Sequence, residues 1–364
     1  MISSLAHVDW HSFLARLPLP SPSPAAITAL TRGPILITGA GGSIGSALAH
    51  RLAAAGACLI LLESSETNLF DLQLSFAESA ANILPAYYLG SVADRSLLDE
   101  IFALHRPRLV IHAAAFKHVP LMEEQPLAAI ANNILATESL AAASSAYGAR
   151  IVLLSTDKAV APASAMGATK RVAEQIVLAS GGIVLRLGNV LASRGSVAEV
   201  FARQIAVGVP LIVNDPAARR YFLTINEAVD QLLIAAAEQD PPALLVPDLC
   251  NPQFIADLAR FISHTLAPGR DVQLEFTQPR AGDKQTEQLW STTETPEAVK
   301  QRRLTGITSP IPAASQLESR LDAVRDGVDA RDVAAALAAL CSLVPDYTPS
   351  TTVLRLRGAT MSHE

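Results

Sequence analysis

Between residues 34 and 187, short apolar runs alternate with longer segments whose apolar residues recur every three or four positions. Short apolar runs are typical of buried parallel strands, and the three-to-four spacing is typical of helices packed on a sheet. The expected strands are 34–38, 58–63, 86–89, 109–112, 151–155 and 183–187. The helices expected between them are 43–55, 68–80, 95–104, 128–147 and 166–179. This strict alternation predicts an α/β fold with a doubly wound parallel sheet and right-handed crossovers.

Beyond residue 190 the pattern is looser and predicts a smaller α/β lobe. Expected helices 197–207, 225–237 and 254–266 alternate with expected strands 211–213, 244–247 and 272–276. We assign 33–192 to the larger domain, to which segments near 220–250 return, and 193–312 to an interrupted substrate-binding lobe. Residues 313–350 are expected to form C-terminal helices and 351–364 a tail, which is expected to be frayed from Arg355 onward. Four alternating prolines at 18–24 make 1–32 an N-terminal arm containing an extended linker.

Composition narrows the class of protein. Half of the 364 residues are hydrophobic, 17% are charged, and the net charge is 28 − 34 = −6. These values are typical of a globular protein and argue against disorder and against a nucleic-acid partner. The three widely spaced cysteines indicate neither a disulfide framework nor a metal site. With no expected signal peptide or membrane span, we predict a cytoplasmic protein.

The first expected strand leads directly into the segment Gly39-Ala-Gly-Gly-Ser-Ile-Gly45, and a helix follows at once. Glycines at 39, 42 and 45 permit a tight turn, a close approach of the backbone to a pyrophosphate, and close packing of helix on strand. At a strand-to-helix junction of a first βαβ unit, this spacing predicts the phosphate loop of a Rossmann-type dinucleotide site. A glycine turn without a ligand is the alternative.

Glu63 ends the second expected strand, 63 − 39 = 24 residues after the first glycine. An acid near this spacing binds the ribose hydroxyls of the adenosine. Because its carboxylate would repel a 2′-phosphate, NAD is favoured over NADP. NADP stays open, since Ser64, Ser65 or Arg51 could modify this preference.

The fifth strand ends in Ser155-Thr-Asp-Lys-Ala159, and Met166 and Lys170 lie four residues apart on the helix that follows. Here the sequence resembles the extended short-chain dehydrogenases/reductases, and within them the UDP-N-acetylglucosamine 4,6-dehydratases of bacterial polysaccharide biosynthesis. The resemblance runs from about residue 13 to residue 347. Its other motifs are Thr38–Gly45, His112–Pro120, Asn132-Asn133, Arg186–Val190, Ser193–Val197, Arg220–Phe222 and Arg280–Lys284.

The resemblance implies oxidation of the sugar at C4, removal of the C5 proton, loss of the C6 hydroxyl as water, and return of the hydride to C6. It assigns Thr156 to the C4 hydroxyl, Asp157 as the acid at O6 and Lys158 as the base at C5. A lysine base must be neutral, so we expect burial or nearby Lys170 to lower its pKa. Met166 stands where most of the superfamily has a catalytic tyrosine. The Met166 thioether either fills the core, or Met166 belongs to a site in which the C4 proton leaves by another route. That route would run through Asp157, or through the nicotinamide ribose and Lys170.

The resemblance also implies contacts to both ligands. Residues expected at the cofactor are Gly39, Gly42, Ser43, Ile44, Gly45, Glu63, Ser64, Asn68, Ser91, Val92, Ala113, Ala114, Lys117 and Lys170. Residues expected at the substrate are Lys117, Asn189, Val190, Arg194, Ser196, Arg280 and Asp283. Ser91-Val92 departs from the usual family residues, which leaves the adenine contact open. Asn133 is expected to support the site.

We therefore predict an NAD(P)-dependent dehydratase with a UDP-sugar substrate, no metal and a homo-oligomeric state. Two alternatives stay open. A nucleotide-sugar epimerase of the same fold would need neither a C5 base nor a C6 acid, and a non-catalytic NAD(P)-binding protein would be consistent with the missing tyrosine. The segment from Phe13 to Pro18 resembles the linker that precedes the catalytic domain in larger relatives. The chain is thus expected to be such a catalytic domain standing alone.

Overall fold

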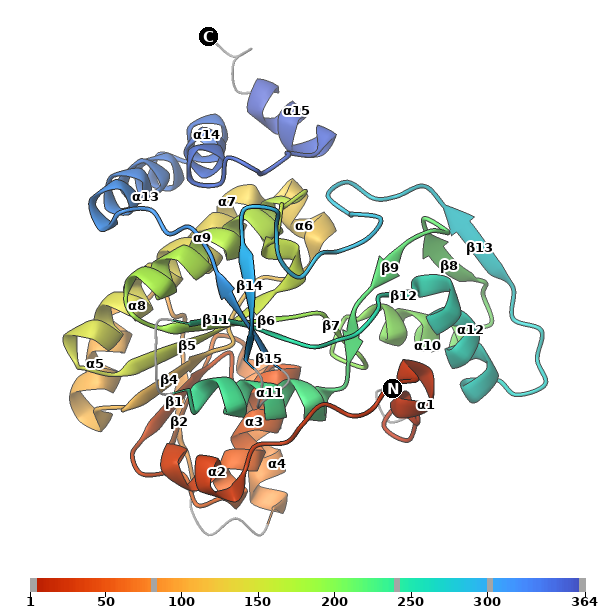
Figure 1. Cartoon of the computed structure of the whole chain (residues 1–364), viewed down its shortest axis with the longest axis horizontal. Helices are drawn as coiled ribbons and strands as arrows, with labels where there is room; N and C mark the ends of the chain where they lie inside the picture. Colours follow the sequence, from red (N-terminus) through yellow and green to blue (C-terminus); the bar gives the residue numbers. More distant parts are fainter. Residues whose placement is uncertain (1–4, 80–83, 239–242, 300–303, 360–364) are drawn as a thin grey trace.

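A nine-stranded sheet forms the centre of the larger lobe (Figure 1). The computed structural model describes residues 5–79, 84–238, 243–299 and 304–359. Seven neighbouring strands run parallel in the order β11-β6-β5-β4-β1-β2-β3. They are β1 (Ile35–Thr38), β2 (Leu59–Glu63), β3 (Ala86–Leu89), β4 (Leu109–His112), β5 (Arg150–Thr156), β6 (Ile183–Leu187) and β11 (Ala243–Pro247). The predicted doubly wound sheet is confirmed, and its strand order reverses between β1 and β4.

Two further strands form an antiparallel hairpin at one edge of this sheet. β15 (Leu304–Thr308) pairs with β11, and β14 (Thr295–Val299) forms the outer edge. The sequence pattern did not predict this hairpin. Its strands contain a proline, a glycine and several polar residues, as edge strands often do, so they lack the continuous apolar run of a buried parallel strand.

Helices cover both faces of the sheet (Figure 1). The helix α11 (Ile225–Ala236) packs against α3 (Ser43–Ala54), while α9 (Ala165–Ala179) packs against β5 and β6. The other helices of the larger lobe include α4 (Glu66–Glu78) and α5 (Arg95–His105). Because further helices cover its outer side, α9 is buried along almost its whole length. Its charged residues therefore need partners inside the protein.

The segment 128–147, expected as one helix, is broken into three parts. The helix α7 (Pro126–Ile130) passes through a π-helical turn (Ala131–Leu135) into α8 (Ala136–Ala146). Such a turn inserts one extra residue into a helix. It contains the buried Asn133, which accepts a hydrogen bond from the Phe116 N–H (2.9 Å) and donates to Phe116 O (3.0 Å) and Thr169 Oγ1 (3.1 Å). The periodicity of the apolar residues does not reveal this insertion.

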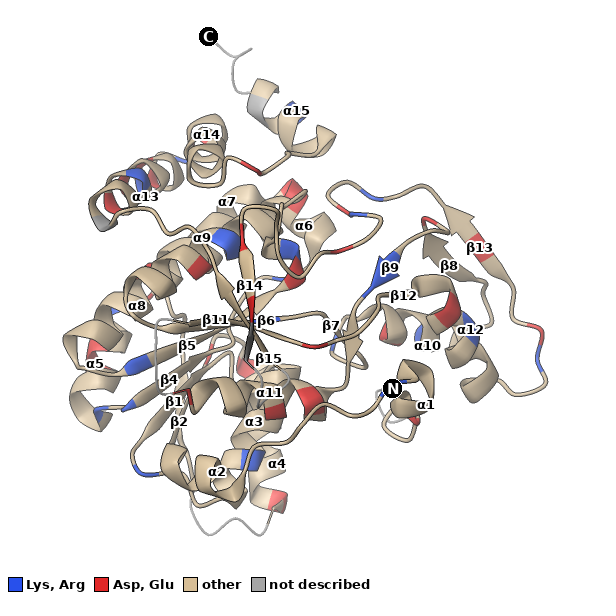
Figure 2. Ribbon diagram, viewed as in Figure 1, with Lys and Arg blue, Asp and Glu red and all other residues tan. Residues whose placement is uncertain are grey.

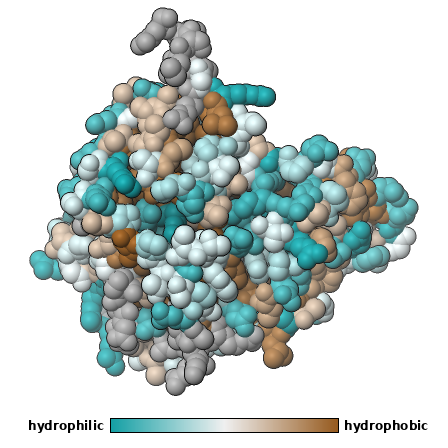
Figure 3. All heavy atoms as spheres, turned by 45° about the horizontal axis from the view of Figure 1, so that its top comes forward, coloured by the Kyte–Doolittle hydropathy of each residue, from teal (hydrophilic) through white to brown (hydrophobic). Residues whose placement is uncertain are grey.

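A second core lies in the smaller lobe. The helices α10 (Val197–Val207) and α12 (Ile255–Leu266) pack on the parallel pair β8 (Leu211–Asn214) and β13 (Leu274–Thr277). Two-stranded ladders connect the lobe to the larger one: β7 (Asn189–Val190) with β10 (Phe222–Leu223), and β9 (Arg219–Arg220) with β12 (Gln253–Phe254). Figure 3 shows apolar surface on this lobe, where Val207, Ile212 and Phe276 are exposed.

The N-terminal arm is more structured than its prolines suggest. The helix α1 (Trp10–Leu14) is packed into the smaller core, and the Phe13 ring lies 5.7 Å from that of Phe222. A second helix, α2 (Pro24–Leu30), begins at the last of the four prolines and packs on α11. Proline is well suited to the first turn of a helix, which explains this correction.

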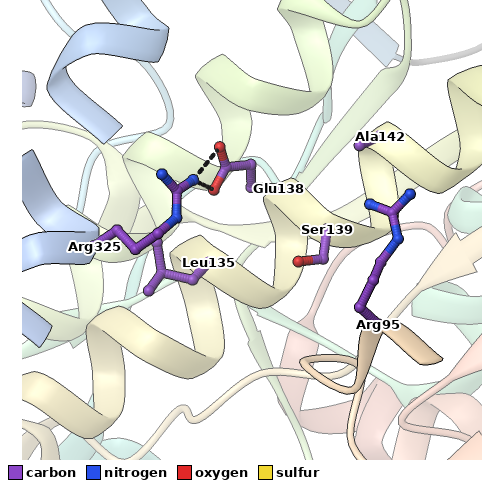
Figure 4. A pocket seen from close by; sticks show the side chains of 6 residues that line it. All are labelled: Arg95, Leu135, Glu138, Ser139, Ala142 and Arg325. Carbon is purple, nitrogen blue, oxygen red and sulfur yellow. Dashed lines mark hydrogen bonds and ion pairs between the residues drawn. The ribbon is translucent and has the colours of Figure 1, made fainter. Parts of the chain in front are cut away.

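The C-terminal residues pack against the larger lobe. They form α13 (Ala314–Asp329), α14 (Val333–Leu343) and α15 (Thr351–Ala359), and Arg325 of α13 donates to both oxygens of Glu138 at 2.9 Å (Figure 4). The expectation that the tail is frayed from Arg355 is wrong as far as Ala359, because these residues belong to α15, in which Val353 is buried and which packs on α6 (Val119–Glu124). The last five residues lie outside the described part. In the described residues, no helix combines the length and apolarity needed to cross a bilayer.

Candidate active site

The predicted site residues gather at the carboxyl ends of the parallel strands. The phosphate loop follows β1, Glu63 ends β2 with Ser64 next to it, and Ser91 and Val92 follow β3. Ala113, Ala114 and Lys117 follow β4, Thr156 ends β5 with Asp157 and Lys158 directly after it, and Asn189 and Val190 follow β6. In an open parallel sheet this edge, beside the reversal of strand order, is where ligands bind. Figure 2 shows the basic strand β9 of the smaller lobe close to this edge.

The phosphate loop has the close contacts that its glycines allow. Gly39 has a φ of +66°, and a Cβ there would lie 2.7 Å from the Ala114 Cα. A Cβ on Gly45 would lie 2.2 Å from Gly39 O. Only glycine at position 45 therefore allows the helix to begin this close to the end of the strand. At Gly42 the nearest contact of a Cβ would be 3.2 Å. The next residues, Ser43 and Ile44, open α3.

Glu63 is tied to the loop from the neighbouring strand. Its carboxylate is buried and accepts hydrogen bonds from the N–H groups of Gly41 (2.9 Å) and Ser65 (3.0 Å). Ser64 beside it is exposed. The acid is therefore held at the end of β2, next to the loop, as its spacing predicted. Such a loop, with a helix N-terminus and a fixed acid beside it, fits a dinucleotide.

The segment at the end of β5 brings three functional groups together. Asp157 is fully buried, and its Oδ1 accepts hydrogen bonds from Thr156 Oγ1 (2.9 Å) and Lys158 Nζ (3.0 Å). Lys158 Nζ also donates to Asn189 Oδ1 at 2.9 Å, and Asn189 lies in β7, directly after β6. The Oδ2 atom of Asp157 is buried and has no hydrogen-bond partner among the described residues. A buried acceptor of this kind favours the binding of a ligand hydroxyl.

Burial raises the pKa of the Asp157 carboxyl, and the nearby Glu287 carboxylate raises it further, against the opposing effect of Lys158. A buried carboxyl with a raised pKa can hold and return a proton near neutral pH. This direction fits the acid predicted at this position.

The pKa of Lys158 contradicts the expectation. Burial lowers it, but the carboxylates of Asp157 and Glu287 outweigh burial and raise the pKa above its ordinary value. Lys158 is therefore a cation in the resting protein, and Lys170 does not neutralise it. The expectation was wrong because it took no account of the carboxylates of Asp157 and of Glu287, whose Oε1 lies 3.5 Å from Lys158 Nζ.

Lys170 lies on α9, the helix that packs against β5. Its Nζ donates to Leu154 O at 2.9 Å, and burial lowers its pKa to about 8, opposed by Glu174. Met166, one turn earlier on α9, is buried in a small apolar cluster with Val119, Met122 and Ala129. This position is consistent with packing, the simpler of the two interpretations of Met166.

A loop from the smaller lobe crosses the phosphate loop. The Arg194 N–H donates to Ser43 Oγ at 2.9 Å, and its guanidinium donates to Asn68 Oδ1 and to Gly41 O. Lys117 Nζ donates to Arg194 O at 2.7 Å. Arg194 thus lies against the expected cofactor loop in this structure, and its predicted contact with a substrate diphosphate stays a prediction.

The remaining predicted residues have local partners or none. The Oγ of Ser196 is buried without a hydrogen-bond partner in the described part of the chain. Arg280 Nε donates to Asp283 Oδ2 at 3.2 Å, and the Arg280 side chain is exposed. Ser91 is exposed and accepts from the Ala93 N–H, while Val92 belongs to the core. Nothing in these contacts tests the predicted adenine contact.

Sequence reasoning missed Glu287. It is buried, its Oε2 lies 2.8 Å from Lys284 Nζ, and its Oε1 lies 4.0 Å from Arg220 Nε. Lys284 Nζ also donates to Val160 O at 2.8 Å, which holds this segment against the end of β5. The sequence offered one signal for Glu287, which is an acidic residue three positions after the Arg280–Lys284 motif.

Comparison with known proteins gives one consistent family. The profile of the family described as "Polysaccharide biosynthesis protein" matches residues 35–308. The probable polysaccharide biosynthesis protein EpsC of Bacillus subtilis is 39% identical over 270 residues, which cover 71% of this chain and 45% of EpsC. The capsular polysaccharide biosynthesis protein CapD of Staphylococcus aureus is 36% identical over 304 residues, covering 80% of this chain and 51% of CapD. The chain thus spans about half the length of these two relatives.

Solved structures agree with the fold. The structure of Pen from Bacillus thuringiensis superposes with a TM-score of 0.70 at 25% identity, covering 78% of this chain and 89% of Pen. The UDP-glucose 4-epimerase of Thermus thermophilus, solved in complex with NAD, gives a TM-score of 0.60 at 20% identity, covering 70% of this chain and 90% of the epimerase.

Proposed function

This chain belongs to the polysaccharide biosynthesis protein family, and from that premise we propose that it is an NAD-dependent nucleotide-sugar 4,6-dehydratase. The proposed substrate is UDP-N-acetylglucosamine or a related UDP-hexose, and the product is a 4-keto-6-deoxy sugar. The observation that carries the proposal is the contact of Asp157 with both Thr156 and Lys158 at the end of β5. The proposed acid and base are in the same hydrogen-bonded group.

The proposed cofactor contacts fit the phosphate loop. Gly39, Gly42 and Gly45 leave room for a pyrophosphate beside the N-terminus of α3, and Glu63 is held where it would bind adenosine ribose hydroxyls. When bound, NAD would accept a hydride from the sugar and return it. The carboxylate of Glu63 beside the phosphate loop would repel the 2′-phosphate of NADP and so favours NAD. The NAD complex of a structural relative supports the same cofactor.

The roles of the protein groups follow from their contacts. Thr156 Oγ1, which already donates to Asp157, would receive the C4 hydroxyl proton and pass it on. Asp157, with its raised pKa, would hold this proton and deliver it to O6 as the C6–O bond breaks and water leaves. Lys158 would take the C5 proton. These assignments keep the order implied by the family resemblance.

A nucleotide-sugar epimerase is the second candidate, because the structural relative from Thermus thermophilus has that activity and the same fold. Epimerisation at C4 moves a hydride away from and back to the same carbon. It uses neither a C5 base nor a C6 acid, so the adjacent Asp157 and Lys158 favour dehydration. A non-catalytic NAD-binding protein would leave this buried acid-base pair without a purpose.

The test is incubation of the protein and NAD with UDP-N-acetylglucosamine in deuterated water. Dehydration predicts a loss of about 18 mass units in ordinary water, from the elimination of one water, and about 17 in deuterated water, because one deuterium enters at C5 and is seen there by NMR. We expect Asp157→Asn and Lys158→Ala to abolish both signals. A C4 epimer of unchanged mass would favour the epimerase. Unchanged UDP-hexoses with retained NAD binding would favour the binding protein.

The substrate contacts and the assembly extend this proposal. We propose that Asn189, Val190, Arg194, Ser196, Arg280, Asp283 and Lys117 line the UDP-sugar site. The homo-oligomeric state and the domain boundaries stay predictions.

A further inference from the structure

Three acceptor oxygens surround the Lys158 amine in the structure. Asp157 Oδ1 lies 3.0 Å from Nζ, Asn189 Oδ1 lies 2.9 Å away and Glu287 Oε1 lies 3.5 Å away. An ammonium group has three N–H donors and no lone pair. This arrangement therefore suits a charged lysine, which cannot remove a proton from C5.

The proposed dehydration needs two proton acceptors at the same time. The C4 hydroxyl proton leaves first and goes to Asp157, where it stays until the C6 hydroxyl departs. The C5 proton leaves in between. At that moment Asp157 is already protonated, so it is not available to take a proton from Lys158.

Glu287 is the second carboxylate beside Lys158. It lies on the segment that follows the Arg280–Lys284 motif, it is 3% exposed, and the cations Lys284 and Arg220 also face it. Burial raises the pKa of Glu287, but Lys158, Lys284 and Arg220 outweigh burial and lower it, so the carboxylate is ionised in the resting protein and can accept a proton. Asn189 is an amide and takes up no proton near neutral pH. The Lys158 side chain is 18% exposed, which limits direct exchange with solvent.

We propose that Glu287 is the positioning residue that makes Lys158 a base, by accepting one proton from the Lys158 ammonium before the C5 step. An N–H bond of Lys158 breaks and an O–H bond of Glu287 forms. The neutral amine then takes the C5 proton and later returns one of its protons, or a deuteron in deuterated water, to C5. Glu287 finally returns its own proton to Lys158, so no proton is gained or lost by the pair.

This inference rests on the proposed function, and it predicts a specific pH signature. Because the proton moves within the pair, C5 exchange in the wild type should be nearly independent of pH near neutrality. In Glu287→Gln the proton must leave to solvent, so the logarithm of the exchange rate should rise by about one per pH unit. At pH 7 we expect a loss of about tenfold or more, which recovers as the pH rises.

Two measurements carry the test. The first is exchange of the C5 proton for deuterium, followed beside oxidation at C4, which is measured in a single turnover as the absorbance of the reduced nicotinamide. The second needs no substrate: NMR titration of ¹³C-labelled lysine in the protein, with the Lys158 signal assigned by Lys158→Arg. Removing the Glu287 charge should lower the pKa of Lys158, because this carboxylate raises it.

Glu227→Gln is the matched control. Glu227 is also a buried carboxylate, paired with Arg16 at 2.7 Å and capping α11, and it lies outside the proposed catalytic group. This variant should keep the wild-type pH profile. Where Glu287→Gln does not fold, Glu287→Asp decides: its shorter carboxylate should slow C5 exchange about tenfold and keep the flat profile.

Each outcome supports or overturns the inference. A flat pH profile and an unchanged Lys158 pKa in Glu287→Gln, or wild-type C5 exchange in Glu287→Asp, would overturn it while leaving the dehydratase intact. An equal loss of C4 oxidation and C5 exchange at every pH would also overturn it, since it would indicate a general structural role. Failure of the wild type to dehydrate any UDP-hexose would instead refute the proposed function.

Discussion

The guanidinium of Arg186 donates to both carboxylate oxygens of Glu174, with Nε–Oε1 and Nη2–Oε2 distances of 2.8 and 2.7 Å. Arg186 is fully buried on β6 and also donates to Glu294, in the segment before β14. Glu174 in turn accepts from Ser155 Oγ at 2.6 Å. This network joins β5, β6, α9 and the edge hairpin directly behind the candidate catalytic group.

Replacing Arg186 by Met should destabilise the protein strongly. The change leaves two buried carboxylates without their main partner, and breaking a buried ion pair costs about 3–5 kcal/mol of unfolding free energy. Urea unfolding measures the change. Arg325→Met is the control, because the Arg325–Glu138 pair is partly exposed and should contribute about 1 kcal/mol or less. Equal effects of the two changes would contradict this interpretation.

The same network predicts a loss of stability in acid. Burial raises the pKa of Glu174 and of Glu294, but Arg186 outweighs burial and holds both values below 4.5. Carboxyls with a lowered pKa in the folded state stabilise it above their unfolded pKa, and this contribution is lost as the pH falls further. Tm should therefore fall below about pH 4.5 in the wild type, and fall less steeply in Arg186→Met. A parallel fall in both proteins would argue against this assignment.

Glu63 should set the preference between the two dinucleotides. Its carboxylate accepts from two backbone N–H groups beside the phosphate loop, where it would bind ribose hydroxyls and repel a 2′-phosphate. In Glu63→Ala, the ratio of the NADP and NAD dissociation constants should fall about tenfold or more. Fluorescence titration with both nucleotides measures this. Asp71→Asn removes an exposed carboxylate from α4, the helix that follows β2, and should leave the ratio unchanged.

Met166→Leu tests whether the thioether takes part in catalysis. Met166 packs against Val119, Met122 and Ala129, and Met-to-Leu exchange in a core usually costs less than about 1.5 kcal/mol. We expect dehydration within about threefold of the wild type, because packing is retained. A hundredfold loss with an unchanged Tm would instead assign a chemical role to the sulfur.

The parallel strands and the phosphate loop could be predicted from the sequence because their signals are local. Four consecutive buried residues, Ile35–Thr38, run into Gly39, and both the strand and the turn follow from neighbours in the chain. Glu287 could not be found this way. Its partner Lys158 is 129 residues earlier (287 − 158), and the loop that brings them together has no apolar periodicity.

The charge state of Lys158 was missed in part for the same reason. Burial of a lysine at a strand end could be expected from sequence, and burial lowers its pKa. The opposing effect comes first from Asp157, whose side chain contacts Lys158 in the fold, and then from Glu287, which tertiary structure places beside it. The edge hairpin and the helix α15 were missed because polar residues, a proline and glycines interrupt their apolar residues, and because their packing partners lie in other parts of the chain.

The π-helical turn at Ala131–Leu135 has a consequence for chain length. A π turn accommodates one inserted residue, and each residue of an α-helix turns it by about 100°. Deleting one residue here would let the segment become regular α-helix while α7 and α8 keep their faces toward the core. The Asn133 amide, which joins the loop at Phe116 to Thr169 of α9, would then lose its place. In an alignment, a one-residue gap at this point would thus mark a chain that keeps the fold and gives up this link between the loop at Phe116 and the helix α9.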